Sequence, residues 1–255
     1  MKKLGVIQGR LSKPTEGFQE CPLDWEREFD LLPGLGLDHI EWIITTSNYL
    51  TNPLFGTDLS GYPISSVCAD FMVHPDFKKK SYLSSFLIPV CEASLRSDLK
   101  RITIPLLEES SVSRDPDLYD FINCFKEVVE RFPDISFLIE AELEPYKLKK
   151  ILDISPSIMV TYDTGNITSC NLNHKHYTTE LSSRISQVHL KDRTLSPVNT
   201  VPPGEGDTDF RLIFSLLKDI NFGGIYTLQT AREKSDDEIN TISKHKNLLT
   251  SLYNE

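Results

Sequence analysis

The stretch FLIE at residues 137–140 is an apolar run that ends on a carboxylate, and the pattern recurs further along the chain. Apolar runs also lead to a polar side chain in VTYD (160–163), QVH (187–189) and YTLQ (226–229). Short runs of this kind, separated by longer segments with helical spacing, are typical of a parallel sheet built from βα units. These four stretches therefore predict strands whose carboxyl ends carry polar groups.

The same alternation of strand-like and helical segments extends over the whole chain. Strands are predicted at Leu4–Gln8, His39–Ile44, Ile64–Ala69, Arg101–Leu106, Ser136–Ile139, Ile158–Tyr162, Ile185–Leu190 and Gly224–Leu228. Each interval leaves room for one helix and two loops. Eight βα units in 255 residues favour a closed (β/α)₈ TIM barrel, although periodicity alone also allows an open sheet. The GxGxxG loop expected of an open doubly wound sheet is absent, so we expect one α/β barrel domain over 1–255.

Two helix starts are marked in the sequence. Asp115 is predicted as an N-cap with Pro116 at the first helical position, followed by apolar residues three or four positions apart. Near the end of the chain, Ser235 and Glu238 resemble a capping box ahead of another apolar stripe.

The composition restricts the class of protein. Hydrophobic residues make up 39% and charged residues 25%, as in globular proteins, and no apolar run is long enough to span a membrane. The net charge of −10 opposes binding to nucleic acid or anionic lipid. The start MKKLGVIQGRLS lacks the apolar core of a secretory signal, and the five cysteines show no CxxC spacing. We therefore expect a cytoplasmic protein that acts on a small molecule, with homo-oligomerisation left open.

Chemistry in such barrels gathers at the carboxyl ends of the strands. Glu140, Asp163, His189 and Gln229 close four successive predicted strands. If these side chains converge, they form a site of two carboxylates, an imidazole and an amide oxygen. Such a site would suit one divalent ion, with Mn²⁺ or Mg²⁺ favoured and Co²⁺ or Zn²⁺ as alternatives. Taken singly, Asp163 could instead cap the helix that follows it, and Glu41 could be a buried carboxylate with satisfied hydrogen bonds.

These runs and their ends resemble the sugar phosphate isomerase/epimerase family, the xylose-isomerase-like barrels. The resemblance covers essentially the whole chain and rests on GVIQGRLS (5–12), GLDHIEWI (36–43), SVCADF (66–71), FLIEAEL (137–143), YDTGN (162–166), QVHLKDR (187–193), PPGEGDTDF (202–210) and GGIYTLQTAR (223–232). It implies a (β/α)₈ barrel and a divalent metal held by Glu140, Asp163, His189 and the residue at position 229. It also places the loop Gly204–Gly206 beside the active site.

The chain departs from the family pattern at two positions. Many members have, at the position of Gln229, a glutamate that binds metal and moves a proton. An amide oxygen can coordinate a metal, but an amide cannot accept a proton near pH 7. Asn166 replaces a histidine that is common in relatives. We therefore expect weaker metal binding and one base fewer.

The implied chemistry is removal of a proton next to a carbonyl, with the metal stabilising the resulting enediolate as a Lewis acid. Aldose–ketose isomerisation can proceed with one base, whereas the two-base scheme of epimerisation needs another. With Glu140 present and Gln229 unable to share its work, the sequence favours an isomerase. A ketose 3-epimerase is the alternative, with Glu108, Glu142 or Lys191 as second base.

Other polar residues near strand ends are predicted to bind the substrate: Arg10, Glu41, Asp70, Glu142, Asn166, Arg193, Glu205 and Arg232. Together with Lys191, the three arginines place four cations on the rim of an acidic chain, which favours an anionic sugar such as a phosphate. Each cation taken alone is more often a partner in a surface ion pair.

Two other functions stay open on the sequence alone. The chain also resembles the endonucleases that act at abasic sites in DNA, which have a similar fold. Those enzymes use several histidines and acidic residues to bind three zinc ions. Here His189 closes a strand, and His74 is the second candidate. A non-catalytic sugar-binding barrel is the other alternative, which Gln229 keeps open.

Overall fold

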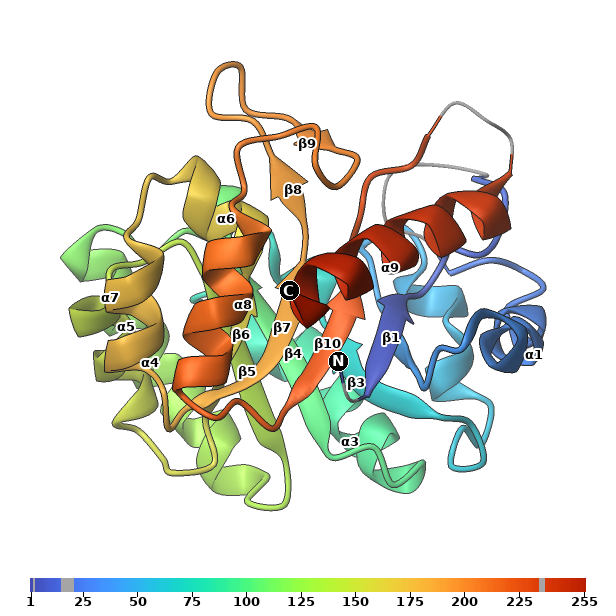
Figure 1. Cartoon of the computed structure of the whole chain (residues 1–255). Coiled ribbons are helices and arrows are strands. Elements are labelled where there is room, and N and C mark those ends of the chain that lie inside the picture. The colour runs from blue at the N-terminus through green and yellow to red at the C-terminus, as the bar shows by residue number, and fades with distance from the viewer. Residues whose placement is uncertain (2, 15–20, 234–236) are drawn as a thin grey trace. The chain divides into compact units, whose positions relative to one another are not determined.

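The protein is described by a computed structural model, which covers residues 1, 3–14, 21–233 and 237–255. Its hydrogen-bonded strands follow the order of a closed barrel, β1-β10-β7-β6-β5-β4-β3-β2 (Figure 1). These strands are β1 (Leu4–Ile7), β2 (Ile40–Ile43), β3 (Ile64–Cys68), β4 (Arg101–Leu106), β5 (Ser136–Ala141), β6 (Met159–Asp163), β7 (Ile185–Leu190) and β10 (Ile225–Leu228). The (β/α)₈ fold class is confirmed, and the expected strand bounds differ from the observed ones by at most two residues.

Helices fill the intervals between the strands. They are α1 (Glu26–Leu35), α2 (Lys80–Tyr82), α3 (Ile88–Arg96), α4 (Asp115–Arg131), α5 (Pro145–Leu152), α6 (Thr164–Ser169), α7 (His174–Glu180), α8 (Phe210–Asp219) and α9 (Glu238–Asn254). Short helical turns are η1 (Tyr49–Thr51), η2 (Pro53–Phe55), η3 (Asp70–Met72), η4 (Leu83–Leu87) and η5 (Glu108–Ser110). In the described part of the chain, no helix combines the length and the apolar character needed to span a membrane.

The chain divides into two compact units. The terminal unit comprises Met1–Ile40 and Thr161–Glu255, and the central unit comprises Glu41–Val160. The expectation of one domain over 1–255 stays a prediction.

In the terminal unit, β1, β10 and β7 pair in parallel. Leu4 lies opposite Tyr226, and Thr227 lies opposite His189. Outside these strands, α8 packs against both α7 and α9. The hairpin β8 (Asp192–Arg193) and β9 (Thr200–Val201) extends beyond the carboxyl end of β7 (Figure 1).

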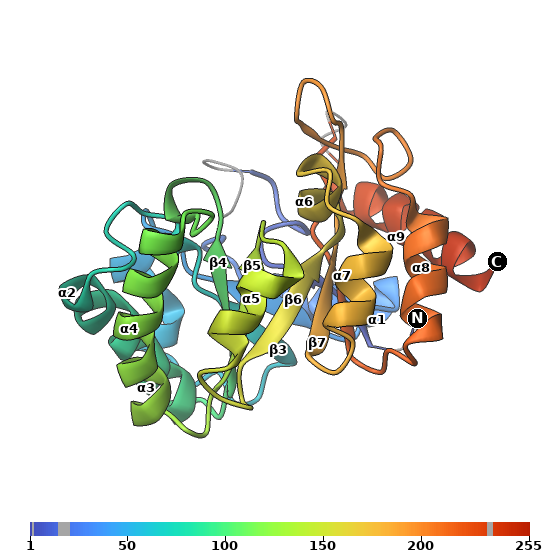
Figure 2. The ribbon, with the colours of Figure 1, turned by 90° about the vertical axis from the view of Figure 1, so that its left-hand side faces the viewer.

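In the central unit, β3, β4 and β5 pair in parallel, with Pro105 opposite Glu140. The helices α3, α4 and α5 cover the outer side of these strands (Figure 2). On α4, Leu118, Phe121 and Phe125 are fully buried at spacings of three and four, which turns one face of the helix toward the core.

The two predicted helix starts need correction. The N-cap of α4 is Arg114, so Asp115 is the first helical residue, where its charge favours the positive end of the helix dipole. The cap of α9 is Asp237, whose carboxylate accepts a hydrogen bond from the Asn240 amide at 2.9 Å. Ser235 lies outside the described residues, and Glu238 opens the helix instead of completing a capping box there.

Candidate active site

Asp163 joins β6 to α6. Its side chain is buried, and Oδ1 accepts a hydrogen bond from the Asn166 amide at 2.8 Å, so the carboxylate caps the helix. The other oxygen, Oδ2, lies 2.8 Å from the ammonium of Lys191 and 4.0 Å from Nδ1 of His189. Asp163 thus caps α6 with one carboxylate oxygen and pairs with Lys191 through the other.

The environment of Asp163 keeps it ionised. Burial by itself raises the pKa of this carboxyl, but its electrostatic interactions with Lys191 and His189 and the hydrogen bonds that it accepts outweigh burial and lower the pKa. The net pKa lies below the ordinary value of an aspartate, which makes Asp163 an anion at neutral pH.

The turns that follow β6 and β7 are fastened to each other. The Thr164 hydroxyl donates to the Lys191 carbonyl at 2.7 Å and accepts from the Lys191 amide at 3.0 Å. The next residue, Gly165, packs so closely on Lys191 that a Cβ there would lie 2.9 Å from its Cγ. This close approach, which requires glycine, fixes where the Lys191 side chain begins.

His189 is fully buried on β7, and its Nε2 lies 2.8 Å from Nε2 of Gln187. A donor and an acceptor must meet across this contact, so the amide of Gln187 selects which ring nitrogen carries the proton. The other ring nitrogen, Nδ1, is the one on the Asp163 side.

Gln229 follows β10, which is paired with β7. Its backbone amide donates to the Leu190 carbonyl at 3.1 Å, and its side chain is 4% exposed. The side-chain oxygen Oε1 is buried and has no hydrogen-bond partner among the described residues. A buried amide oxygen without a partner is unfavourable by about 1–3 kcal/mol, which points to an interaction with a group outside the described residues.

Asp192 organises the loop around Gly204–Gly206. Its Oδ2 accepts from the amides of Gly204 at 2.8 Å and Gly206 at 3.1 Å, and its Oδ1 accepts from Thr208 at 3.1 Å. The loop that the resemblance places beside the active site is therefore held by the residue that follows Lys191. Glu205 is exposed at the tip of this loop.

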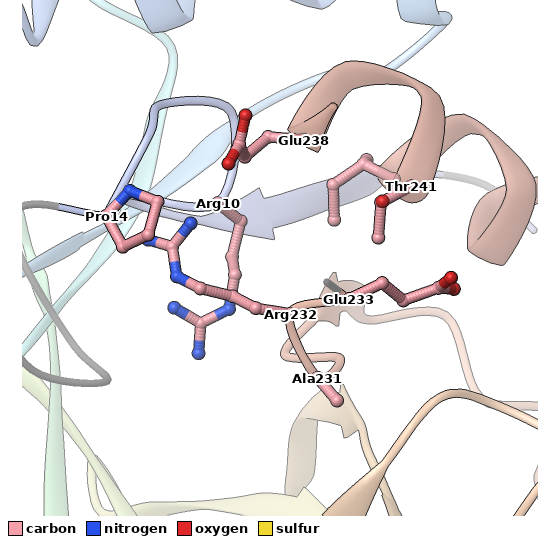
Figure 3. A pocket seen from close by; sticks show the side chains of 8 residues that line it. Arg10, Pro14, Ala231, Arg232, Glu233, Glu238 and Thr241 are labelled. Carbon is pink, nitrogen blue, oxygen red and sulfur yellow. The ribbon is translucent and has the colours of Figure 1, made fainter. Parts of the chain in front are cut away.

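The other predicted site residues of the terminal unit have identified neighbours. Arg193 donates from Nε to the Thr200 hydroxyl at 3.5 Å and from a terminal nitrogen to the Ser169 hydroxyl at 3.3 Å. Arg10 and Arg232 line one pocket of the terminal unit (Figure 3).

The central unit holds the remaining predicted residues. Glu140 is buried near the carboxyl end of β5, and Glu142 follows that strand half-buried. Glu108 is exposed in η5 with a φ of 50°, and Asp70 begins η3.

Glu41 also belongs to the central unit. It is fully buried and accepts from the hydroxyls of Ser66 at 3.1 Å and Thr103 at 2.7 Å. These contacts are those of a satisfied buried carboxylate, the structural alternative raised from the sequence.

Two further residues of the terminal unit were missed from the sequence. Gln187 lies two positions before His189, and the two-residue period of a strand could have placed it on the same face. Glu28 is a buried carboxylate on α1 that accepts from the backbone amides of Gly9 at 2.8 Å and Leu11 at 3.0 Å. No local pattern in the sequence distinguishes Glu28 from the exposed acids around it.

Comparisons with known proteins agree with this architecture. The family model described as xylose isomerase-like TIM barrel matches residues 87–251. A protein of Haemophilus influenzae named "Putative L-ribulose-5-phosphate 3-epimerase" is 26% identical over 273 residues, covering 93% of this chain and 91% of that one.

Solved structures share the fold at low sequence identity. One is the IOLI protein with a bound zinc atom (TM-score 0.76, 16% identity, 98% of this chain and 99% of that one). Another is an L-ribulose 3-epimerase (TM-score 0.74, 12% identity, 100% of this chain and 95% of that one).

Proposed function

Because the chain belongs to the xylose isomerase-like TIM barrel family, we propose that it is a divalent-metal-dependent isomerase of a small sugar or sugar phosphate. The reaction would move a proton between adjacent carbons, one of them a carbonyl carbon. The observation that carries the proposal is a set of buried oxygen and nitrogen atoms that could ligate a metal at the ends of β6, β7 and β10. The set includes Oε1 of Gln229, which has no hydrogen-bond partner among the described residues.

The donor chemistry of the chain fits a divalent ion. Asp163 and His189 of the terminal unit and Glu140 of the central unit have side chains of the types that ligate a divalent metal, and Gln229 adds a neutral oxygen. In this proposal the four residues bind one ion, with Mn²⁺ or Mg²⁺ favoured and Co²⁺ or Zn²⁺ as alternatives. The zinc in the IOLI structure supports a divalent metal in a barrel of this fold. When bound, the ion would supply Lewis-acid stabilisation of the negative charge that develops on the sugar oxygens.

The residues of the chain would divide the remaining work. Glu140, a buried carboxylate, would accept and return the substrate proton. Lys191 would hold Asp163 in its ionised form through their 2.8 Å contact. Gln229 would position substrate or metal without moving a proton, because its amide has no basic site near pH 7. One base suffices for an aldose–ketose isomerisation.

A ketose 3-epimerase is the second candidate, and the names of two relatives favour it. Both the curated relative and one of the solved structures are called 3-epimerases of ribulose or its phosphate. This reaction would need a second base, for which Glu108, Glu142 and Lys191 are the candidates.

The endonuclease alternative has less support. The proposed metal site uses one histidine, His189, with the nearby Asp163 and with Glu140, whereas the endonuclease uses several histidines. His74, the other histidine considered, stacks on the Tyr82 ring at 4.7 Å, and its Nδ1 accepts from the Asp76 amide at 3.1 Å. These contacts give His74 a local packing role.

The test compares Glu140→Gln with Glu142→Gln in the metal-loaded protein, using pentuloses, hexuloses and their phosphates in deuterated water. We expect Glu140→Gln to lower turnover by at least about 100-fold, in the range for loss of a general base, and Glu142→Gln to retain a measurable fraction. The product should be an aldose–ketose isomer that keeps part of the original proton.

Other outcomes would change the assignment. An unmoved carbonyl with one inverted carbon and full deuterium exchange there would reject the isomerase in favour of the epimerase. Protein that binds a sugar but turns over none of the panel after incubation with each of the four metals would support the non-catalytic barrel.

A further inference from the structure

A second pocket of the terminal unit opens at the amino-terminal end of β10. It has a volume of about 370 Å³, and it is lined by Leu217, Lys218, Asn221, Phe222, Gly223, Gly224, Tyr226 and Tyr253. The turn between α8 and β10 lies at the opposite end of this unit from the hairpin of β8 and β9 (Figure 1). In barrels of this type the chemistry takes place at the carboxyl ends of the strands, so the proposed isomerase reaction gives this pocket no role.

The turn that forms one wall of this pocket is held by the hydrogen bonds that end α8. The amide of Phe222 donates to the Leu217 carbonyl at 2.9 Å, and the amide of Asn221 donates to the Lys218 carbonyl at 2.9 Å. Asn221 has a φ of 52°, and with these two bonds it forms the Schellman arrangement common at helix ends. The backbone of this wall is therefore fixed before any ligand binds.

Gly224 allows the ring of Phe222 to pack against the same turn. A Cβ at position 224 would lie 2.4 Å from the Ser186 carbonyl oxygen and 2.6 Å from Cζ of Phe222. Both distances are too short for a side chain, so this close approach requires glycine. The position of the Phe222 ring in the lining is therefore determined by the absence of a side chain at Gly224.

Three aromatic side chains of the lining contact one another edge to face. The rings of Phe222 and Tyr226 meet at 85° with centroids 5.2 Å apart, and those of Tyr226 and Tyr253 meet at 76° with centroids 5.9 Å apart. Behind them, the buried Phe214 contacts Tyr253 with centroids 5.4 Å apart. A planar aromatic ligand can extend such an array by further edge-to-face or offset contacts, which are favourable beyond the area that they bury.

Lys218 supplies a positive charge to this pocket. Its Nζ lies 5.0 Å from the centroid of the Tyr253 ring, a contact that leaves the net charge of the ammonium in place. In the described part of the chain no carboxylate pairs with Lys218, and the lining contains no acidic residue. Of the nearby acids, Asp219 is exposed outside the lining and Glu255 pairs with Arg211 at 2.5 Å. The charges therefore favour an anionic ligand.

The two tyrosines add polar groups to the lining. Their side chains are hydrogen-bonded to each other, and burial followed by the neighbouring Tyr253 raises the pKa of Tyr226. Tyr226 therefore stays neutral at physiological pH and does not repel an anion. When Tyr226 donates in this pair, the hydroxyl of Tyr253 keeps its own proton for an acceptor such as a carboxylate.

The volume of about 370 Å³ lies near the lower end of the range of about 300–1,000 Å³ for small-molecule sites. We propose that this pocket binds a small planar aromatic acid, with its ring among Phe222, Tyr226 and Tyr253 and its carboxylate toward Lys218. An alkyl chain would match the pocket less well, because Leu217 is the one aliphatic side chain in the described lining. The inference does not depend on the proposed isomerase function, since the pocket and Gln229 lie at opposite ends of β10.

The first experiment titrates the full chain with 2-naphthoate by calorimetry, without metal so that the carboxylate cannot bind an ion. Two other probes each lack one feature of the proposed ligand: 2-naphthamide has no charge, and cyclohexanecarboxylate has no aromatic ring. We expect one site for 2-naphthoate per chain. Both other probes should bind at least about fivefold more weakly, because each loses either the charge-assisted hydrogen bond or the aromatic contacts.

The second experiment repeats these titrations on variants of the lining. Lys218→Met and Tyr253→Leu should each weaken binding of 2-naphthoate by at least about fivefold, and Lys218→Met should leave 2-naphthamide nearly unaffected. Lys175→Met, which removes an exposed cation of α7 outside the pocket, is the matched control and should bind as the wild type does.

A further variant keeps the test decisive if Tyr253→Leu fails to fold. A Cβ at Gly223 would have no other atom within 4 Å, so Gly223→Leu should be tolerated by the fold. Because Gly223 lines the pocket, the added side chain should take up space there and weaken binding of 2-naphthoate.

Three results would overturn the inference. The first is the absence of saturable binding of 2-naphthoate at millimolar concentrations, or equal binding by the wild type and every folded variant of the lining. The second is binding of 2-naphthamide as tight as that of 2-naphthoate, which would refute the acid. The third is a loss of binding in Arg232→Met but not in Lys218→Met, which would place the acid in the pocket of Arg10 and Arg232.

Discussion

Nε2 of Gln187 lies 2.8 Å from Nε2 of His189, and both side chains are fully buried on β7. A histidine that ligates a metal commonly uses its second nitrogen in a hydrogen bond that fixes the ring and the tautomer. Gln187 would fit that role with its side-chain amide turned by 180°, so that its oxygen accepts from Nε2 of His189 and leaves Nδ1 for an ion.

Replacing Gln187 with Leu should weaken metal binding by about 10- to 100-fold, because the ring of His189 would lose its orienting partner. Calorimetric titration with Mn²⁺ and Zn²⁺ measures this, and ¹⁵N shifts of His189 in metal-free protein should show a changed tautomer ratio. Ser186→Ala, at the neighbouring position, is the control. Unchanged affinity in a folded Gln187→Leu protein would show that Gln187 does not position His189.

Gln229→Glu should tighten metal binding, because an anionic oxygen would replace the neutral Oε1 that has no partner in the described structure. Gln229→Met keeps a similar volume, removes the oxygen and should weaken metal binding. Both effects are read from dissociation constants at one pH and ionic strength. If neither variant changes the metal affinity, Gln229 is not a ligand.

Lys191→Met should also tighten metal binding, for an electrostatic reason. The ammonium lies 2.8 Å from Asp163 Oδ2 and competes with a second cation for that oxygen. Removing one charge at this distance should raise the metal affinity by about tenfold at low ionic strength. Arg193→Met, which removes a cation that hydrogen-bonds to the hydroxyls of Thr200 and Ser169, serves as the control. Weaker binding in Lys191→Met would instead show that the lysine supports the metal-binding geometry.

His174 should make stability depend on pH. Burial lowers the pKa of this histidine to about 4, with its Nδ1 2.5 Å from the Tyr162 hydroxyl and its Nε2 3.1 Å from the Thr168 hydroxyl. The unfolded chain therefore takes up the proton first. Stability from the neutral ring is present above about pH 6.5 and is lost as the pH falls toward about 4, a loss on the order of 3 kcal/mol.

Urea unfolding of His174→Gln between pH 7 and pH 4.5 measures that dependence. The variant should be less stable at pH 7 and should lose less stability on acidification than the wild type. His176→Gln, which changes an exposed histidine of the same helix, should retain the wild-type slope. An identical slope in His174→Gln would rule out this histidine as the source.

The sequence alone was enough to predict eight βα units, the strand bounds within two residues, and the polar residues at the strand ends. Its periodicity also allowed an open sheet, and closure of the barrel is seen in the strand pairing of the structure. Apolar runs of strand length followed by helical stripes are local signals, so they can be read without knowing which segments meet. Helix starts were less certain: Arg114 and Asp237 cap where Asp115 and Ser235 were expected, since a cap depends on the backbone angles of a single residue.

The roles of the individual polar residues become visible in the folded chain. The sequence predicted four cations on one rim. In the structure, Lys191 pairs with Asp163. Arg10 and Arg232 each donate a hydrogen bond to a backbone carbonyl of a loop more than 200 residues away in the chain. It also assigns Glu28 to the loop after β1 and Gln187 to His189. Such contacts depend on which strands become neighbours when the sheet forms, and no local pattern in the chain encodes them.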